Sequence, residues 1–116
     1  MTEKALAWLI TASFWISDLA IGLTALPLWF GRVPPNRLTG FRVEATLSNP
    51  DLWYQINSLV GRNLVLFSIA HAVVGGVIHL TLMKKGIGVA AGCSAAILIA
   101  GLAIISVHGY LLSQVK

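Results

Sequence analysis

The sequence predicts an all-α integral membrane protein with three transmembrane helices and a short interfacial amphipathic helix between the first and second. Its 116 residues are 57% hydrophobic and only 10% charged, whereas a soluble domain carries about 25% charged residues. Such a chain cannot cover a soluble globule with polar groups. Because one spanning helix takes about 20 apolar residues, the length leaves no room for a separate catalytic domain. We therefore expect a protein that is not an enzyme.

Three apolar stretches each exceed the length of about 18 residues that indicates a membrane span. The first contains one charged residue, Asp18, and the other two contain none. Residues 1–116 therefore form a single membrane domain, in which residues 31–62 connect the first two spans. The second connection, residues 84–86, is so short that the spans on either side must form an antiparallel hairpin. The predicted spans are residues 5–30, 63–83 and 87–112.

The first connection contains a helix start. Asn49 is a favourable N-cap, Pro50 suits the first helical position, and Asp51 complements the positive end of the helix dipole. Apolar residues then recur at helical spacing over residues 52–60, with polar residues on the opposite face. This pattern predicts an amphipathic helix in the membrane interface. The sequence leaves open whether this helix runs into the second span or breaks near Gly61.

The net charge of +4 comes from basic residues that flank the apolar stretches. In these positions they indicate cytoplasmic loops and no nucleic-acid partner. Five lie in the first connection and at the C-terminus, against three on the other side. We therefore expect the N-terminus outside and the C-terminus in the cytoplasm. The five are Arg32, Arg37, Arg42, Arg62 and Lys116, and the three are Lys4, Lys84 and Lys85.

Small residues recur at every fourth position of the third span, at Gly88, Gly92 and Ala96. Stripes of this kind allow helix backbones to approach closely in lipid. We expect this stripe to pack against the second span near Gly75 and Gly76.

Asp18 lies at the middle of the first span. A carboxylate there costs about 2.5–3.5 kcal/mol on insertion scales, so we expect it to be paired or neutral. His71 follows Arg62 by nine residues, which places it at the same depth, about 13 Å in at 1.5 Å per residue. Two interpretations remain open. Asp18 is either the proton or cation site of a small transporter, or a structural group bonded across the bundle or within a homo-oligomer.

Histidines in membrane helices also raise the alternative of a haem or quinone anchor subunit, because two imidazoles can ligate one haem iron. His71 and His79 lie about 12 Å apart along one helix, so they cannot share an iron. Such a site would need His108 or a second chain. For the leading interpretation we predict no cofactor and no metal.

A motif lies in the first connection and at the start of the second span. A glycine-aromatic-arginine element precedes a Thr-Leu pair, a short helix with Trp and Asn, and a further glycine. Its residues are Asn36, Gly40, Arg42, Thr46, Asn49, Trp53, Asn57 and Gly61. In order and spacing, this segment resembles the signature of SdpI-type bacterial immunity proteins.

The resemblance implies a multi-pass protein of the bacterial inner membrane that protects its producer from a secreted peptide toxin. In the protein that names the family, the toxin-bound form also holds a transcriptional regulator at the membrane. The implied partners are membrane lipids, a peptide toxin and a cytoplasmic regulator.

The motif itself allows two interpretations. Helical spacing puts Trp53, Asn57 and Gly61 on one ridge, and the guanidinium of Arg42 can bond several carbonyls or a phosphate. These residues form either a platform for a partner or lipid headgroup, or a lock that holds the connection against the bundle.

Overall fold

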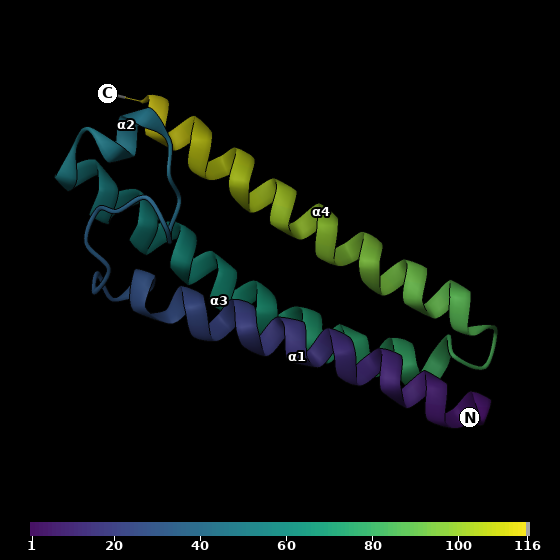
Figure 1. Cartoon of the computed structure of the whole chain (residues 1–116). Helices are drawn as coiled ribbons and strands as arrows, with labels where there is room; N and C mark the ends of the chain where they lie inside the picture. Colours follow the sequence, from purple (N-terminus) through teal and green to yellow (C-terminus); the bar gives the residue numbers. More distant parts are fainter. Residues whose placement is uncertain (116) are drawn as a thin grey trace.

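The computed structural model describes residues 1–115 and contains only helices between turns and loops (Figure 1). The four helices are α1 (Glu3–Trp29), α2 (Glu44–Leu47), α3 (Pro50–Thr81) and α4 (Ile87–Gln114). The three long helices, α1, α3 and α4, are long and apolar enough to cross a membrane. This confirms the predicted class, three spans with a short helix between the first and second. Lys116, which contributed to the charge count, lies outside the described residues.

The helix that follows the first connection begins where the sequence predicts. The side chain of Asn49 accepts a hydrogen bond from the backbone N–H of Leu52 at 3.2 Å, and Pro50 is the first helical residue. The helix then continues without a break to Thr81. The amphipathic segment is therefore the first part of α3, and the short separate helix, α2, lies just before it.

Helix α3 is the central element of the bundle. It packs against α1 on one side and α4 on the other, whereas α1 and α4 make few contacts with each other. The N-terminus lies at the same end as the α3–α4 turn, and α2 and the C-terminal end of α4 lie at the opposite end (Figure 1). We call this opposite end the loop end. The molecule is 52 Å long, and a bilayer core is about 30 Å thick, so both ends project from the hydrocarbon.

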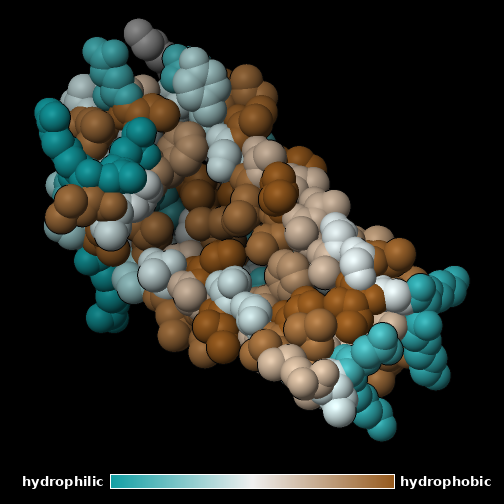
Figure 2. All heavy atoms as spheres, turned by 45° about the vertical axis from the view of Figure 1, so that its right-hand side comes forward, coloured by the Kyte–Doolittle hydropathy of each residue, from teal (hydrophilic) through white to brown (hydrophobic). Residues whose placement is uncertain are grey.

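The surface agrees with this placement. Apolar side chains cover the middle of the molecule, and hydrophilic side chains gather at its two ends (Figure 2). In water these exposed apolar side chains would be unfavourable, but in a bilayer they face lipid tails.

Helices α1 and α3 meet along a seam of polar and small residues. The α1 members of the seam follow one another at intervals of four and three residues, which is the spacing of a left-handed helix pair. Most contacts are hydrogen bonds between the two helices, and the glycines let the backbones approach. From the end with the α3–α4 turn to the loop end, the pairs are Thr11 with His79, Trp15 with Ala72, Asp18 with His71, Gly22 with Ser68, Ala25 with Gly61, and Trp29 with Ser58.

The expectation for the small-residue stripe of α4 is wrong. A Cβ added at Gly88 or Gly92 would meet no atom within 4 Å, so this stripe faces outward. Gly75 and Gly76 instead lie against the indole of Trp15 on α1. Because that ring already fills the space over the two glycines, α4 packs on α3 through other positions, among them Gly101 against Phe67.

Candidate functional site

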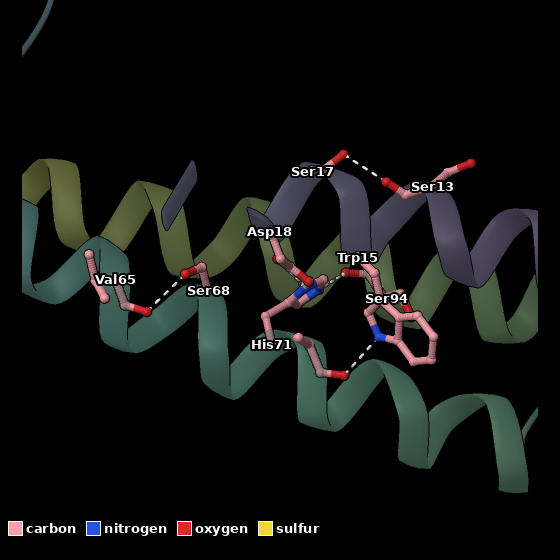
Figure 3. A network of polar contacts seen from close by, with 9 residues as sticks. Ser13, Trp15, Ser17, Asp18, Val65, Ser68, His71 and Ser94 are labelled. Carbon is pink, nitrogen blue, oxygen red and sulfur yellow. Dashed lines mark hydrogen bonds and ion pairs between the residues drawn. The ribbon is translucent and has the colours of Figure 1, made fainter. Parts of the chain in front are cut away.

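Two polar groups meet at the centre of the bundle (Figure 3). His71 Nδ1 lies 2.8 Å and 2.9 Å from the two carboxyl oxygens of Asp18, and the residues are only 2% and 4% exposed. The other ring nitrogen, Nε2, lies 3.0 Å from the backbone carbonyl of Ser94 on α4. The structure thus pairs Asp18 with His71, the histidine expected at the same depth, and His71 connects all three long helices.

The hydrogen bonds determine how many protons this group holds. The Ser94 carbonyl can only accept, so His71 Nε2 must carry a hydrogen. One further proton lies between Nδ1 and the Asp18 carboxyl group, and it belongs either to the imidazolium or to a neutral acid. Both forms have zero net charge. The pair therefore enters the membrane without the free-energy cost of an unpaired buried charge.

The contacts of His71 and His79 also bear on the alternative of a haem site. Both ring nitrogens of His71 are engaged, so a haem iron would have to displace one of these hydrogen bonds. The Nδ1 of His79 lies 2.8 Å from the Thr11 hydroxyl, and its ring lies against Trp8 in a tilted arrangement with centroids 3.9 Å apart. Among residues 1–115, no buried side-chain nitrogen or oxygen lacks a hydrogen-bond partner.

The motif residues lie at the loop end, where they fix the first connection to α3. Asn57 is 1% exposed. Its carboxamide oxygen accepts from the backbone N–H of Phe41 at 2.5 Å, and its NH₂ group donates to the Phe41 carbonyl at 3.2 Å. The buried hydroxyl of Thr46 also donates to that carbonyl and accepts from the N–H of Val43. Two side chains thus satisfy the backbone of a segment without regular structure, as buried backbone requires.

Trp53 and Gly40 form the second part of this arrangement. The Trp53 indole is fully buried and donates its N–H to the Val33 carbonyl at 2.8 Å. Gly40 has a φ of 104°, and an added Cβ would lie 2.8 Å from the Asn57 oxygen and 3.1 Å from the indole. Only glycine combines this backbone angle with such a close approach.

The remaining motif residues hold the two ends of the connection. Asn36 accepts from the N–H groups of Leu38 and Thr39, both at 2.8 Å, and so forms a turn. Gly61 lies where an added Cβ would be 2.6 Å from the backbone nitrogen of Trp29 on α1. Asn49 caps α3, as described above.

Arg42 differs from the other motif residues because its side chain is exposed and charged. Its Nη1 donates to the backbone carbonyl of Arg37. The contacts of Trp53, Asn57 and Gly61 thus support the lock interpretation, and Arg42 is the motif residue that presents charge at the surface.

An apolar recess lies directly beneath this lock. Figure 2 shows the hollow between the helices, with apolar side chains lining it. Its volume is about 390 Å³. Its walls come from α1, α3 and α4, and its roof is the backbone turn of the motif. The lining includes Ile21, Thr24 and Leu28 of α1, Thr39, Gly40 and Phe41 of the connection, Leu64 of α3, and Leu102, Ile105 and Ser106 of α4.

Sequence reasoning missed the recess and two contacts of the seam. Trp15 donates its indole N–H to the Ala72 carbonyl at 3.0 Å, and Thr11 contacts His79. The interval of four and three residues along the first span could have revealed the seam. No pattern in the sequence signals the recess, because it forms only where three helices and the connection meet.

Comparison with known families supports the motif resemblance. The sequence model of the SdpI/YfhL protein family matches residues 32–113, which is more than half of the chain. The match covers the connection, α2, α3 and nearly all of α4, so Asp18 on α1 lies outside it and His71 inside. No curated protein and no solved structure matches the chain. The chain belongs to the SdpI/YfhL protein family.

Proposed function

We propose that this chain is an immunity protein of the bacterial inner membrane, without enzymatic activity, that protects its producer from a secreted peptide toxin. The observation that carries the proposal is the family match over residues 32–113. The burial and hydrogen bonds of the motif support the proposal, because they hold the first connection against α3. We call this held connection, which covers the loop end of the three-span bundle, the cap.

In this proposal the two ends of the molecule have different tasks. The charge distribution favours the loop end in the cytoplasm and the N-terminus outside. The toxin would meet the bundle from the outer side or from within the bilayer. A cytoplasmic regulator would meet the cap, where Arg42 is exposed and Trp53 and Asn57 hold the surface in shape.

A protection assay tests this proposal. The chain is expressed in a bacterium that is sensitive to a peptide toxin encoded beside its gene, and growth is measured with and without toxin. We expect the chain to restore growth. No protection, with normal amounts of protein in the membrane, would contradict the immunity function.

A matched pair of variants tests the part played by the cap. Arg42→Ala should reduce protection or recruitment of the regulator, whereas Arg62→Ala, which removes another exposed arginine near the loop end, should not. The amount of each variant in the membrane and its melting temperature in detergent separate loss of function from loss of folding. Equal protection by both variants would remove Arg42 from the mechanism.

One observation favours a second candidate, a small transporter that uses Asp18 as a proton or cation site. Asp18 also lines a groove of about 360 Å³ between α1 and α3. Release of protons on addition of a candidate substrate to reconstituted protein, absent in Asp18→Asn, would favour transport. An unchanged signal in Asp18→Asn would exclude this residue as the transport site.

A further inference from the structure

We infer that the recess beneath the cap is a binding site for an anionic phospholipid, with one acyl chain in the recess and the phosphate group against Arg37 and Arg42. This inference is independent of the immunity function.

The first argument is the position of the recess. It lies between α1 and α4, which make few contacts with each other, so it opens sideways toward the bilayer. Along α1 it extends from Ile21 to Leu28, about 10 Å at 1.5 Å per residue. A ligand that enters from this side must come from the membrane, and the most abundant molecules there are lipid chains.

The second argument is the chemistry of the walls. Ile21, Leu28, Leu64, Leu102 and Ile105 offer apolar surface to a hydrocarbon chain. The hydroxyl of Thr24, which also lines the recess, donates to the carbonyls of Ala20 and Ile21 of its own helix. That hydroxyl is therefore satisfied without a polar ligand, and most of the other side chains that line the recess are apolar.

The third argument is the charge beside the roof. Residues 39–41 line the recess, and Arg37 and Arg42 flank this segment. The hydrogen bond from the Arg42 guanidinium to the Arg37 carbonyl holds the two residues on the same turn. Both side chains are exposed, and the Asp18–His71 contact is the one ion pair among residues 1–115. Arg37 and Arg42 thus lie just before and just after the segment that roofs the recess, and neither forms an ion pair among the described residues.

This combination fits an anionic phospholipid better than a cationic peptide. Arginine binds phosphate through several N–H groups at once, and anionic lipids are attracted to basic groups at the membrane surface with about 1 kcal/mol for each charge. A cationic peptide would be repelled by the same two arginines. The charges of Arg37 and Arg42 therefore favour an anionic headgroup, and the recess favours an acyl chain.

The test measures lipid binding directly. Purified full-length protein in detergent is titrated with phosphatidylglycerol, with phosphatidylcholine and with soluble glycerol phosphate, and bound lipid is counted by native mass spectrometry beside the melting temperature. We expect phosphatidylglycerol to remain bound and to raise the melting temperature most. Equal effects of both lipids would overturn the role of the arginines. A full effect of glycerol phosphate alone would overturn the role of the recess.

Two pairs of variants localise the site. Ser106→Trp fills the recess, whereas Ala100→Trp places the same side chain on the exposed surface of α4 away from it. We expect only Ser106→Trp to abolish retention of phosphatidylglycerol. Retention by Ser106→Trp equal to that of the parent protein would overturn the proposal.

The charge variants are Arg37→Gln and, as control, Arg32→Gln, another exposed arginine of the same connection. Arg37 is chosen because its contact with Arg42 uses the backbone carbonyl, which the substitution keeps. Arg37→Gln should weaken phosphatidylglycerol binding about fivefold, which corresponds to the loss of one interfacial charge, and Arg32→Gln should not. Equal weakening by both would indicate attraction by general charge and would overturn the assigned site.

Discussion

The carboxamide of Asn57 bonds both the backbone N–H and the backbone carbonyl of Phe41, so one side chain on α3 pairs with the connection as a neighbouring strand would. The same NH₂ group also donates to the Trp53 carbonyl one turn earlier on α3, at 3.1 Å. Asn57 therefore fixes the turn at Gly40 and Phe41, which forms the roof of the recess. The buried side chains of the motif thus determine the backbone conformation at the loop end of the bundle.

Asn57→Ala should lower the free energy of unfolding by about 1–3 kcal/mol for each buried partner left without a hydrogen bond. The N–H of Phe41 loses its partner, whereas the carbonyl keeps Thr46. Asn63→Ala is the control, because Asn63 lies two turns further along α3 and bonds only the exposed side chain of Arg62 among the described residues. Unfolding of both variants in detergent gives the measurement, and equal stability would contradict the lock.

Much of this architecture could be predicted from local patterns. The spans follow from apolar length, and the start of α3 follows from Asn49, Pro50 and Asp51, because a helix cap is formed by neighbouring residues. The equal depth of Asp18 and His71 also follows, since depth in a membrane can be counted along each helix, and a carboxylate there must be paired or neutral.

The unpredicted features depend on which face each helix turns toward its neighbour. The stripe at Gly88 and Gly92 suggested a helix contact, but composition cannot show that Trp15 already covers Gly75 and Gly76. In the same way, the bond from Trp53 to the Val33 carbonyl joins residues 20 positions apart, in a segment without regular structure. Contacts of this kind have no periodicity that a sequence could show.

The Asp18–His71 pair should behave as a unit. Asp18→Leu alone and His71→Leu alone should each destabilise the protein by about 3–5 kcal/mol, because each leaves a buried partner unpaired. The double variant should cost less than the sum of the two, since two apolar side chains leave no unpaired group. Unfolding of all three variants in detergent checks this, and additive losses would show that the pair contributes no coupling.

Asp18→Asn should be milder than Asp18→Leu. An asparagine NH₂ group can donate to the Nδ1 of a neutral His71, while Nε2 keeps its bond to the Ser94 carbonyl. We expect a loss below about 1.5 kcal/mol, the net worth of one hydrogen bond. A loss as large as that of Asp18→Leu would mean that the negative charge of Asp18 is itself required.

The ends of α3 should lie on opposite sides of the membrane. Asp51 is in its first turn, and Lys85 lies in the turn after its last residue, so about 45 Å of helix at 1.5 Å per residue separates them. Single cysteines at these two positions, in a Cys93→Ser background, should be labelled by an impermeant reagent from opposite sides. Labelling of both from one side would contradict the three-span topology.

Two glycine-to-alanine changes should have opposite effects. In a helix, alanine is favoured over glycine by about 1 kcal/mol, so Gly92→Ala, whose added Cβ meets nothing within 4 Å, should stabilise the protein slightly. At Gly61 the added Cβ would lie 2.6 Å from the Trp29 nitrogen and 2.8 Å from the Ala25 carbonyl oxygen. These are backbone atoms of α1, so the helices must move apart. Overpacking of this kind costs about 1–3 kcal/mol, which exceeds the gain in helix propensity. Melting temperatures of both variants in detergent should therefore shift in opposite directions, and stabilisation by Gly61→Ala would show that α1 and α3 do not approach as closely at this position.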